Sequence, residues 1–214
     1  MTWCAWIEQG REIGVSSEAL GRLARALALT PAERAYLFEL AERRDPDAPA
    51  VLEAEQAPAS VAALVDAVPH PAYALDRLWN ACCWNAGAQA LFVGWLGEGG
   101  AAEPNLLRYT FTSPAAQRLL PDWEERARRL LAEFRAHCAP MVNDAALEAF
   151  IDQMRIESPL FAAEWERQSV LAREGGERGF HHGEAGLRRY VQHTFSPAER
   201  PDYKVVILFP APPA

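Results

Sequence analysis

Residues 71–92, PAYALDRLWNACCWNAGAQALF, place two short apolar runs and a helix signal within one stretch of the chain. Asp76 and Arg77 separate the two runs and can form the two-residue turn of a β-hairpin. Residues 78–84 are rich in aromatic and apolar side chains, as a mostly buried strand requires. Asn85 can then cap a helix by accepting a backbone N–H of its first turn. The stretch predicts a hairpin that leads directly into a helix.

This order of elements resembles the opening of the PAS-like sensory fold, in which helices over an antiparallel sheet enclose a ligand. Trp79 and Trp84 in the second run are costly to leave in water and large enough to wall a cavity. A packed two-layer core without a cavity is the alternative, and residues 71–92 by themselves favour neither.

Length and composition allow one large domain, or one domain with a small attachment, in this chain of 214 residues. Half of the residues are apolar, and seven Trp and nine Phe can build a sizeable core. Apolar runs stay shorter than a membrane-spanning helix requires, and the N-terminus lacks a signal-peptide pattern, so we expect a soluble cytoplasmic protein. The net charge of −8 argues against nucleic-acid affinity across the whole surface.

The four cysteines, Cys4, Cys82, Cys83 and Cys138, show no CxxC spacing. Cys82 and Cys83 are neighbours in a predicted strand, so their side chains are expected on opposite faces of the sheet. We therefore expect neither a metal site nor a mutual disulfide, and interpret all four cysteines as small apolar fillers.

Residues 1–44 predict three short helices that form a small module. A strong start signal lies at Thr30 to Glu33, where a capping box has proline at the first helical position. Tyr36 and Leu40 belong to the apolar face of the helix that follows. Residues 45–59 contain three prolines and are interpreted as a linker, which leaves 60–214 as the main domain.

The main domain continues with helices and ends in strands. Amphipathic helices are predicted at about 122–137, after Asn143–Asp144 and after Ser158–Pro159, with the arginines and glutamates of the first on its outer face. The apolar period then changes to two, which predicts strands at 178–182, 187–195 and 204–209. The last strand is almost continuously apolar and should be central. The fold class is therefore α+β, with a five-stranded antiparallel sheet covered by helices.

The segment WCAWIEQGREIGVSSEALGRLARALALTPAERAYLFELA resembles the helix-turn-helix of XRE-type regulators of the MmyB-like group. The resemblance implies that its first helix is the recognition helix, with DNA contacts from Trp3, Trp6, Gln9 and Arg11. Because the chain begins inside that helix, we expect a partial, N-terminally truncated helix-turn-helix bundle. Residues 1–44 carry six arginines and six acidic residues, so we expect the chain as given to bind DNA poorly.

The second half resembles the MmyB-like ligand-binding domain. The matching segments are PAYALDRLWNACCWN, NLLRYTF, PDWEERARRLLAEFRA, SPLFAAEW and KVVILFPAP. The resemblance implies a PAS-like domain and a long-chain fatty-acyl ligand, so a bound fatty acid or similar lipid is expected and no other cofactor.

Candidate ligand-binding residues are those that can face both the helices and the sheet. The apolar candidates are Trp79, Trp84, Leu91, Phe92, Leu106, Tyr109, Phe111, Trp123, Phe134, Phe150 and Trp165. The polar candidates for a head group are Asn80, Asn85, Arg108 and His193. Arg108 is the preferred carboxylate partner, because a guanidinium matches a carboxylate with two hydrogen bonds, and a solvated arginine is the alternative.

The sequence gives little support for metal binding or for enzymatic catalysis. His181 and His182 with Glu184 could suggest a metal site, but adjacent strand histidines point to opposite faces and make a poor chelate. GxSxG, P-loop and GxGxxG motifs are absent from the sequence, so we expect neither a metal site nor an enzyme.

Two functions remain. The first is a transcription regulator whose PAS-like domain binds a hydrophobic, fatty-acyl-like effector and shifts a linked DNA-binding module. The second is a stand-alone lipid-binding or dimerising protein without DNA binding. In both cases the apolar faces of residues 1–44 predict a homodimer.

Overall fold

The computed structural model describes residues 15–41, 43, 57–97, 104–139, 141, 144–167, 176–182 and 186–212. The chain divides into two compact units, Met1–Ala54 and Glu55–Ala214.

The first unit contains the helices α2 (Ser17–Ala26) and α3 (Pro31–Leu40). The Ser16 hydroxyl caps α2 by accepting the backbone N–H of Ala19 at 3.3 Å. Among the described residues of this unit, Leu20, Ala24 and Phe38 are buried apolar side chains.

The capping box of α3 is present as predicted. Thr30 Oγ1 accepts the backbone N–H of Glu33 at 3.3 Å, and Glu33 Oε2 accepts the backbone N–H of Thr30 at 2.8 Å. Two residues of the predicted apolar face are open to solvent. Phe38 is buried, whereas Tyr36 and Leu40 are 60% and 65% exposed.

The second unit alternates short helices with five strands. Its elements are α4 (Ala59–Ala67), β1 (Ala72–Leu75), β2 (Ala81–Trp84), α5 (Ala86–Leu91), α6 (Leu106–Thr112), α7 (Pro114–Leu119), α8 (Trp123–Cys138), α9 (Ala145–Glu157), α10 (Pro159–Glu166), β3 (Gly176–His181), β4 (Leu187–Phe195) and β5 (Lys204–Pro210). The three C-terminal strands follow the sequence prediction to within two residues at each end.

The five strands form one antiparallel sheet in the order β2-β1-β5-β4-β3. The apolar strand β5 lies at its centre, as its sequence predicted. The predicted PAS-like α+β fold is confirmed.

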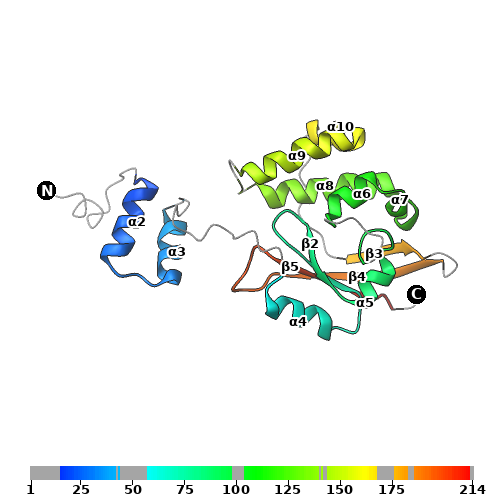
Figure 1. Ribbon diagram of the computed structural model, residues 1–214, viewed down its shortest axis with the longest axis horizontal. Coiled ribbons are helices and arrows are strands. Elements are labelled where there is room, and N and C mark those ends of the chain that lie inside the picture. The colour runs from blue at the N-terminus through cyan, green and yellow to red at the C-terminus, as the bar shows by residue number, and fades with distance from the viewer. Residues whose placement is uncertain are drawn as a thin grey trace. The chain divides into compact units, whose positions relative to one another are not determined.

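Helices cover both faces of this sheet (Figure 1). Tyr73, Leu75, Val206 and Leu208 point toward the large core, which residues of α5 to α10 complete. The alternate residues of β1 and β5, which are Ala72, Ala74, Val205 and Ile207, point the other way and pack against α4. Val61 and Val65 of α4 are buried in this contact. The large core lies between the sheet and the long helix α8.

The hairpin has a longer connection than its sequence suggested. Strand β2 begins at Ala81 rather than at residue 78, because Trp79 adopts a left-handed backbone conformation with φ of 65°. The Asp76 carboxylate holds this turn by accepting the backbone N–H groups of Leu78 at 2.8 Å and Asn80 at 2.9 Å. Trp79 is consequently buried as part of the turn and not as part of a strand.

A β-bulge changes the expected alternation in β2. Ala74 of β1 pairs with Cys83, while the next residue, Leu75, pairs with Ala81, so Cys82 is an extra residue in β2. Cys82 and Cys83 both pack against the α4 cluster, which consists of Val61, Val65, Ala72, Ala74, Val205 and Ile207. The prediction that they occupy opposite faces is therefore wrong.

Among the described residues, helices are too short or too polar to cross a membrane.

Candidate functional site

A cavity lies between α6, α8 and the inner face of the sheet. Its volume is about 70 Å³, enough for several water molecules. The residues that line it are Tyr73, Phe92, Leu106, Tyr109, Thr110, Leu120, Arg126, Arg129, Leu130, Glu133, Arg178, Phe180, Gln192 and Leu208. They combine an aromatic and aliphatic wall with a cluster of charged groups.

Aromatic rings build the apolar wall. The Phe92 ring packs edge-on against Phe180 and Tyr73, with centroid distances of 5.4 and 5.5 Å. Behind this wall, Trp95 stacks on Tyr109 at 5.6 Å. Such interlocked rings hold their orientation, so the wall is largely preformed.

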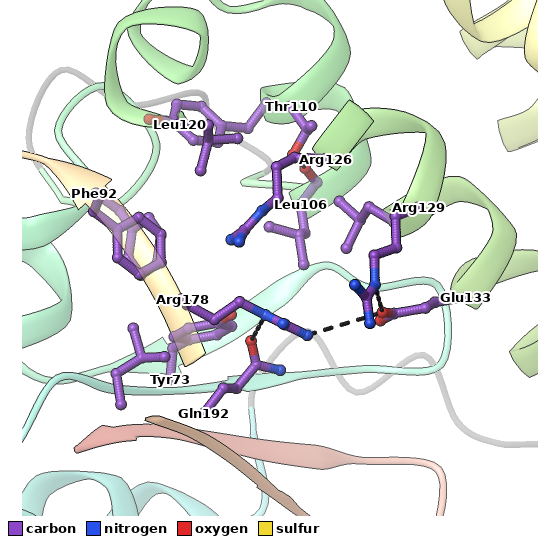
Figure 2. Close-up of a pocket in the computed structure, with 14 residues that line it drawn as sticks. Tyr73, Phe92, Leu106, Thr110, Leu120, Arg126, Arg129, Glu133, Arg178 and Gln192 are labelled. Carbon is purple, nitrogen blue, oxygen red and sulfur yellow. Dashed lines mark hydrogen bonds and ion pairs between the residues drawn. The ribbon is translucent and has the colours of Figure 1, made fainter. Parts of the chain in front are cut away.

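The charged side of the cavity joins α8 to the edge strand β3 (Figure 2). Arg178 Nε donates to Gln192 Oε1 at 3.3 Å, and Arg178 Nη2 lies 4.0 Å from Glu133 Oε1. Arg129 Nε approaches the same carboxylate oxygen at 3.6 Å. Glu133 and Arg178 are only 5% and 8% exposed, so these charges interact in a medium that screens them weakly.

Arg126 is different from its two neighbours. Its side chain points into the cavity (Figure 2), and it makes no hydrogen bond or ion pair to any residue that the structure describes. Its guanidinium carbon lies 5.9 Å from the centre of the Phe180 ring. Burial, with Arg178 and Arg129 nearby, lowers the pKa of Arg126 to about 10. The group stays protonated at neutral pH, with its charge poorly compensated.

The charges of the cavity do not balance. Among the described residues that line it, three arginines accompany one glutamate, so the positive side chains outnumber the negative by two. Since Glu133 is already shared by Arg129 and Arg178, the excess is concentrated at Arg126. An anion with an apolar body is the ligand chemistry that this arrangement complements.

Arg126 and Arg129 also line an outer groove of about 280 Å³ beside β3. The groove is completed by Glu177, Gly179 and Leu187 from the edge of the sheet, among others. The two arginines thus stand between the inner cavity and the surface, and a ligand entering from this groove would meet them first.

Three of the fifteen predicted ligand-binding residues line the cavity: Phe92, Leu106 and Tyr109. The arginines of α8 were predicted on its outer face. Two of them, Arg126 and Arg129, point inward instead, because Arg126, Arg129, Leu130 and Glu133 follow the i, i+3, i+4, i+7 spacing of one helix face. That spacing, together with Arg178 and Phe180 two residues apart in β3, is the signal that could have found the cavity.

The two asparagine candidates have structural roles. The Asn85 amide donates to the carbonyls of Val65, Val68 and His70 and its oxygen accepts two backbone N–H groups, so its hydrogen-bonding capacity is used. The Asn80 amide donates to Asp76 at 2.9 Å and accepts from Asn105 at 2.9 Å. Neither lines the cavity.

Arg108 and His193 lie away from the cavity. Arg108 Nε donates to Glu157 at 2.8 Å, because this position of α6 faces α9 and not the sheet. His193 belongs to the opposite face of β4, where it is exposed beside Phe195 and Phe209. Gln192, one residue earlier, takes the inward position instead.

The remaining candidates pack elsewhere in the second unit. Trp79 meets Phe134 edge-on at 5.1 Å, and Phe134 contacts Phe150 in turn. The other candidates that do not line this cavity are Trp84, Leu91, Phe111, Trp123 and Trp165. Trp123 Nε1 donates to the carbonyl of Thr110, which fixes α8 against α6.

The proposed DNA-contacting residues Trp3, Trp6, Gln9 and Arg11 lie outside the described residues, as does Glu184. Within the part of the chain that the structure describes, no group of three or more His, Cys, Asp or Glu side chains could hold a metal ion.

Residues 57–214 match the family described as the MmyB-like transcription regulator ligand binding domain. The chain belongs to this family. The matched region covers the whole described part of the second unit, including the sheet, the helices and the cavity. No curated protein matches the chain. Membership indicates a ligand-sensing role in transcription regulation.

Proposed function

We propose that the chain is the effector-sensing part of a cytoplasmic transcription regulator, and that its effector is an amphipathic, fatty-acyl-like carboxylate. The observation that carries this proposal is Arg126, a poorly compensated guanidinium inside a cavity with an aromatic wall. A carboxylate supplies the missing charge and can accept two guanidinium hydrogen bonds. The apolar wall provides the surface that an acyl chain would contact.

The size of the cavity bears on the length of the effector. Ligand pockets usually hold about 300–1,000 Å³, whereas the inner cavity measures about 70 Å³. A short acyl group fits that space, while a longer chain needs the outer groove of about 280 Å³ or a movement of α8. Each buried methylene contributes about 0.8 kcal/mol, so chain length should affect affinity strongly.

DNA binding in this proposal belongs to the helix-turn-helix that residues 1–44 resemble. The equal numbers of arginines and acidic residues in this segment support only weak DNA affinity for the chain by itself, since phosphate contacts dominate such binding. We also propose that the chain forms a homodimer through this unit. Leu27, Tyr36 and Leu40 are exposed apolar side chains within it, which supports such a contact.

The test is a binding series with the purified chain. Saturated carboxylic acids of about four to fourteen carbons and the matching alcohols are added, and melting temperature and native mass are measured. We expect the acids to bind and to raise the melting temperature more than the alcohols. If no acid or alcohol of any length binds, and denatured protein releases no lipid, the sensing proposal is wrong.

A further inference from the structure

The bulge in β2 brings two thiols to the same side of the sheet. Cys82 is the extra residue of the bulge and Cys83 pairs with Ala74, so both side chains pack against the α4 cluster. In a regular strand these neighbours would lie on opposite faces, out of reach of each other. The local backbone therefore creates a dithiol that the sequence pattern does not predict.

The two thiols have different surroundings. Cys82 Sγ donates to the carbonyl of Ala74 at 3.3 Å. The neighbouring Cys83 thiol raises the pKa of Cys82, and the Cys82 thiol lowers the pKa of Cys83, although burial acts on Cys83 in the opposite sense. Cys83 is thus the better nucleophile of the pair, and Cys82 holds a proton beside it.

Access also distinguishes this pair from the third described cysteine. Strand β2 is an edge strand, and both Cys82 and Cys83 are only partly buried. Cys138 is buried in the large core, where burial raises the pKa of its thiol to about 12. Cys138 is therefore a built-in control for thiol reactivity.

We propose that Cys82 and Cys83 form a peroxide-reactive dithiol site beneath α4. This proposal is independent of the effector proposed for the cavity, because the α4 cluster lies on the other face of the sheet.

The chemistry needs a hydroperoxide as the oxidant. The Cys83 thiolate attacks the peroxide oxygen, the O–O bond breaks, and the leaving hydroxide takes a proton to become water. Cys83 is then a sulfenic acid. Cys82 sulfur attacks the Cys83 sulfur, the S–O bond breaks, and the second water leaves with the Cys82 proton. Two thiols and one hydrogen peroxide become one disulfide and two waters.

The expected structural consequence is local. A disulfide between neighbouring residues closes a small ring, so the bulge must change its backbone conformation, and the hydrogen bond from Cys82 to Ala74 is lost. The α4 helix packs directly on this part of the sheet through Val61 and Val65. Oxidation should therefore loosen α4, the first described helix of the second unit.

The experiment treats the folded chain with hydrogen peroxide, blocks remaining thiols with iodoacetamide and digests with trypsin. Cleavage after Arg77 and Arg108 leaves Cys82 and Cys83 alone in peptide 78–108, and Cys138 in another peptide. We expect peptide 78–108 to lose two hydrogens and to resist alkylation. This oxidation should be at least about tenfold faster than the modification of Cys138. Reduction before alkylation should restore both thiols.

Matched variants assign the roles. In Cys82→Ala the Cys83 sulfenic acid cannot be resolved, so dimedone should label Cys83; in Cys83→Ala labelling should fall sharply. The wild-type result stands even if a variant folds poorly. The proposal is overturned if peptide 78–108 reacts no faster than Cys138, or if it gains oxygen without losing two hydrogens.

Discussion

Glu133 on α8 and Arg178 on β3 face each other across the cavity, with 4.0 Å between Oε1 and Nη2. The same carboxylate oxygen lies 3.6 Å from Arg129 Nε. One glutamate thus serves two guanidinium groups, and this sharing leaves Arg126 as the cation with the least compensation. The charge of the site is set by this arrangement of four side chains.

Replacing Arg126 by methionine should separate head-group recognition from chain burial. Methionine keeps an unbranched side chain but removes the charge. Since hydrogen bonds to charged groups contribute about 1.5–3 kcal/mol, we expect carboxylate affinity to fall about tenfold or more. Affinity for the matching alcohols should change little, as measured by calorimetry.

Arg108→Met is the matched control for that variant. Arg108 is paired with Glu157 and lies outside the cavity, so carboxylate affinity should stay close to wild type. If Arg126→Met weakens acids and alcohols equally, the cavity binds ligand but the assignment of Arg126 is wrong. If Arg108→Met selectively weakens the acids instead, Arg108 is the head-group partner after all.

Asn85→Ala should destabilise the fold without a direct effect on the cavity. The change removes donors to the carbonyls of Val68 at 2.9 Å and His70 at 2.8 Å, and the cap of α5. We expect a loss of about 2–3 kcal/mol in the free energy of unfolding, measured by urea denaturation. Gln117→Ala, at an exposed position of α7, should change it by less than about 0.5 kcal/mol; equal effects would contradict the structural role of Asn85.

The stability of the fold should depend on pH through Asp144. Although burial opposes it, backbone N–H donors and Arg77 hold the pKa of Asp144 below its usual value of 3.8. A depressed folded-state pKa adds stability above the unfolded-state value, and this is lost as pH falls through the folded-state value. Asp144→Asn keeps a capping side chain, so it should cost about 0.5–1 kcal/mol at pH 7.

The difference between wild type and Asp144→Asn should shrink as the pH falls below about 4, where wild-type Asp144 begins to protonate in the unfolded chain. Urea denaturation at several pH values measures it. A difference that stays constant from pH 7 to pH 2.5 would show that charge has no part in the effect.

The homodimer proposed for the first unit should depend on its exposed apolar side chains. We expect the double variant Tyr36→Ser and Leu40→Glu to convert a dimer into a monomer in light scattering, because a buried charge opposes an apolar contact. Leu64→Glu, on the exposed side of α4, is the control. An unchanged mass for the double variant would place any dimer contact elsewhere.

Local signals in the sequence predicted most of the fold. The period-two patterns located β3, β4 and β5, and the apolar run of β5 identified the central strand. Asn85 capped α5 as expected, with Oδ1 accepting the N–H of Ala88 at 3.0 Å. These features depend on residues close in the chain, where periodicity and capping act directly.

Residue types alone could not predict which side chains line the cavity. By residue type, Arg126 and Arg129 are typical of a solvated helix face, and His193 is typical of a buried hydrogen-bonding residue. Which face of α8 meets the sheet, and which face of β4 meets α8, is decided by packing between distant elements. That packing places Gln192 inward and His193 outward.

The sequence by itself determined the elements, their order, the five-stranded sheet and the family to which the ligand-binding region belongs. Only the tertiary structure decided where the charges and thiols lie. Arg126 and Glu133 line the same cavity as Arg178, although about fifty residues separate them in the sequence. A single extra residue in β2 puts Cys82 and Cys83 on one face. Periodicity predicts a regular helix or strand, whereas a bulge or a buried charge cluster depends on the backbone and side chains of the neighbouring element.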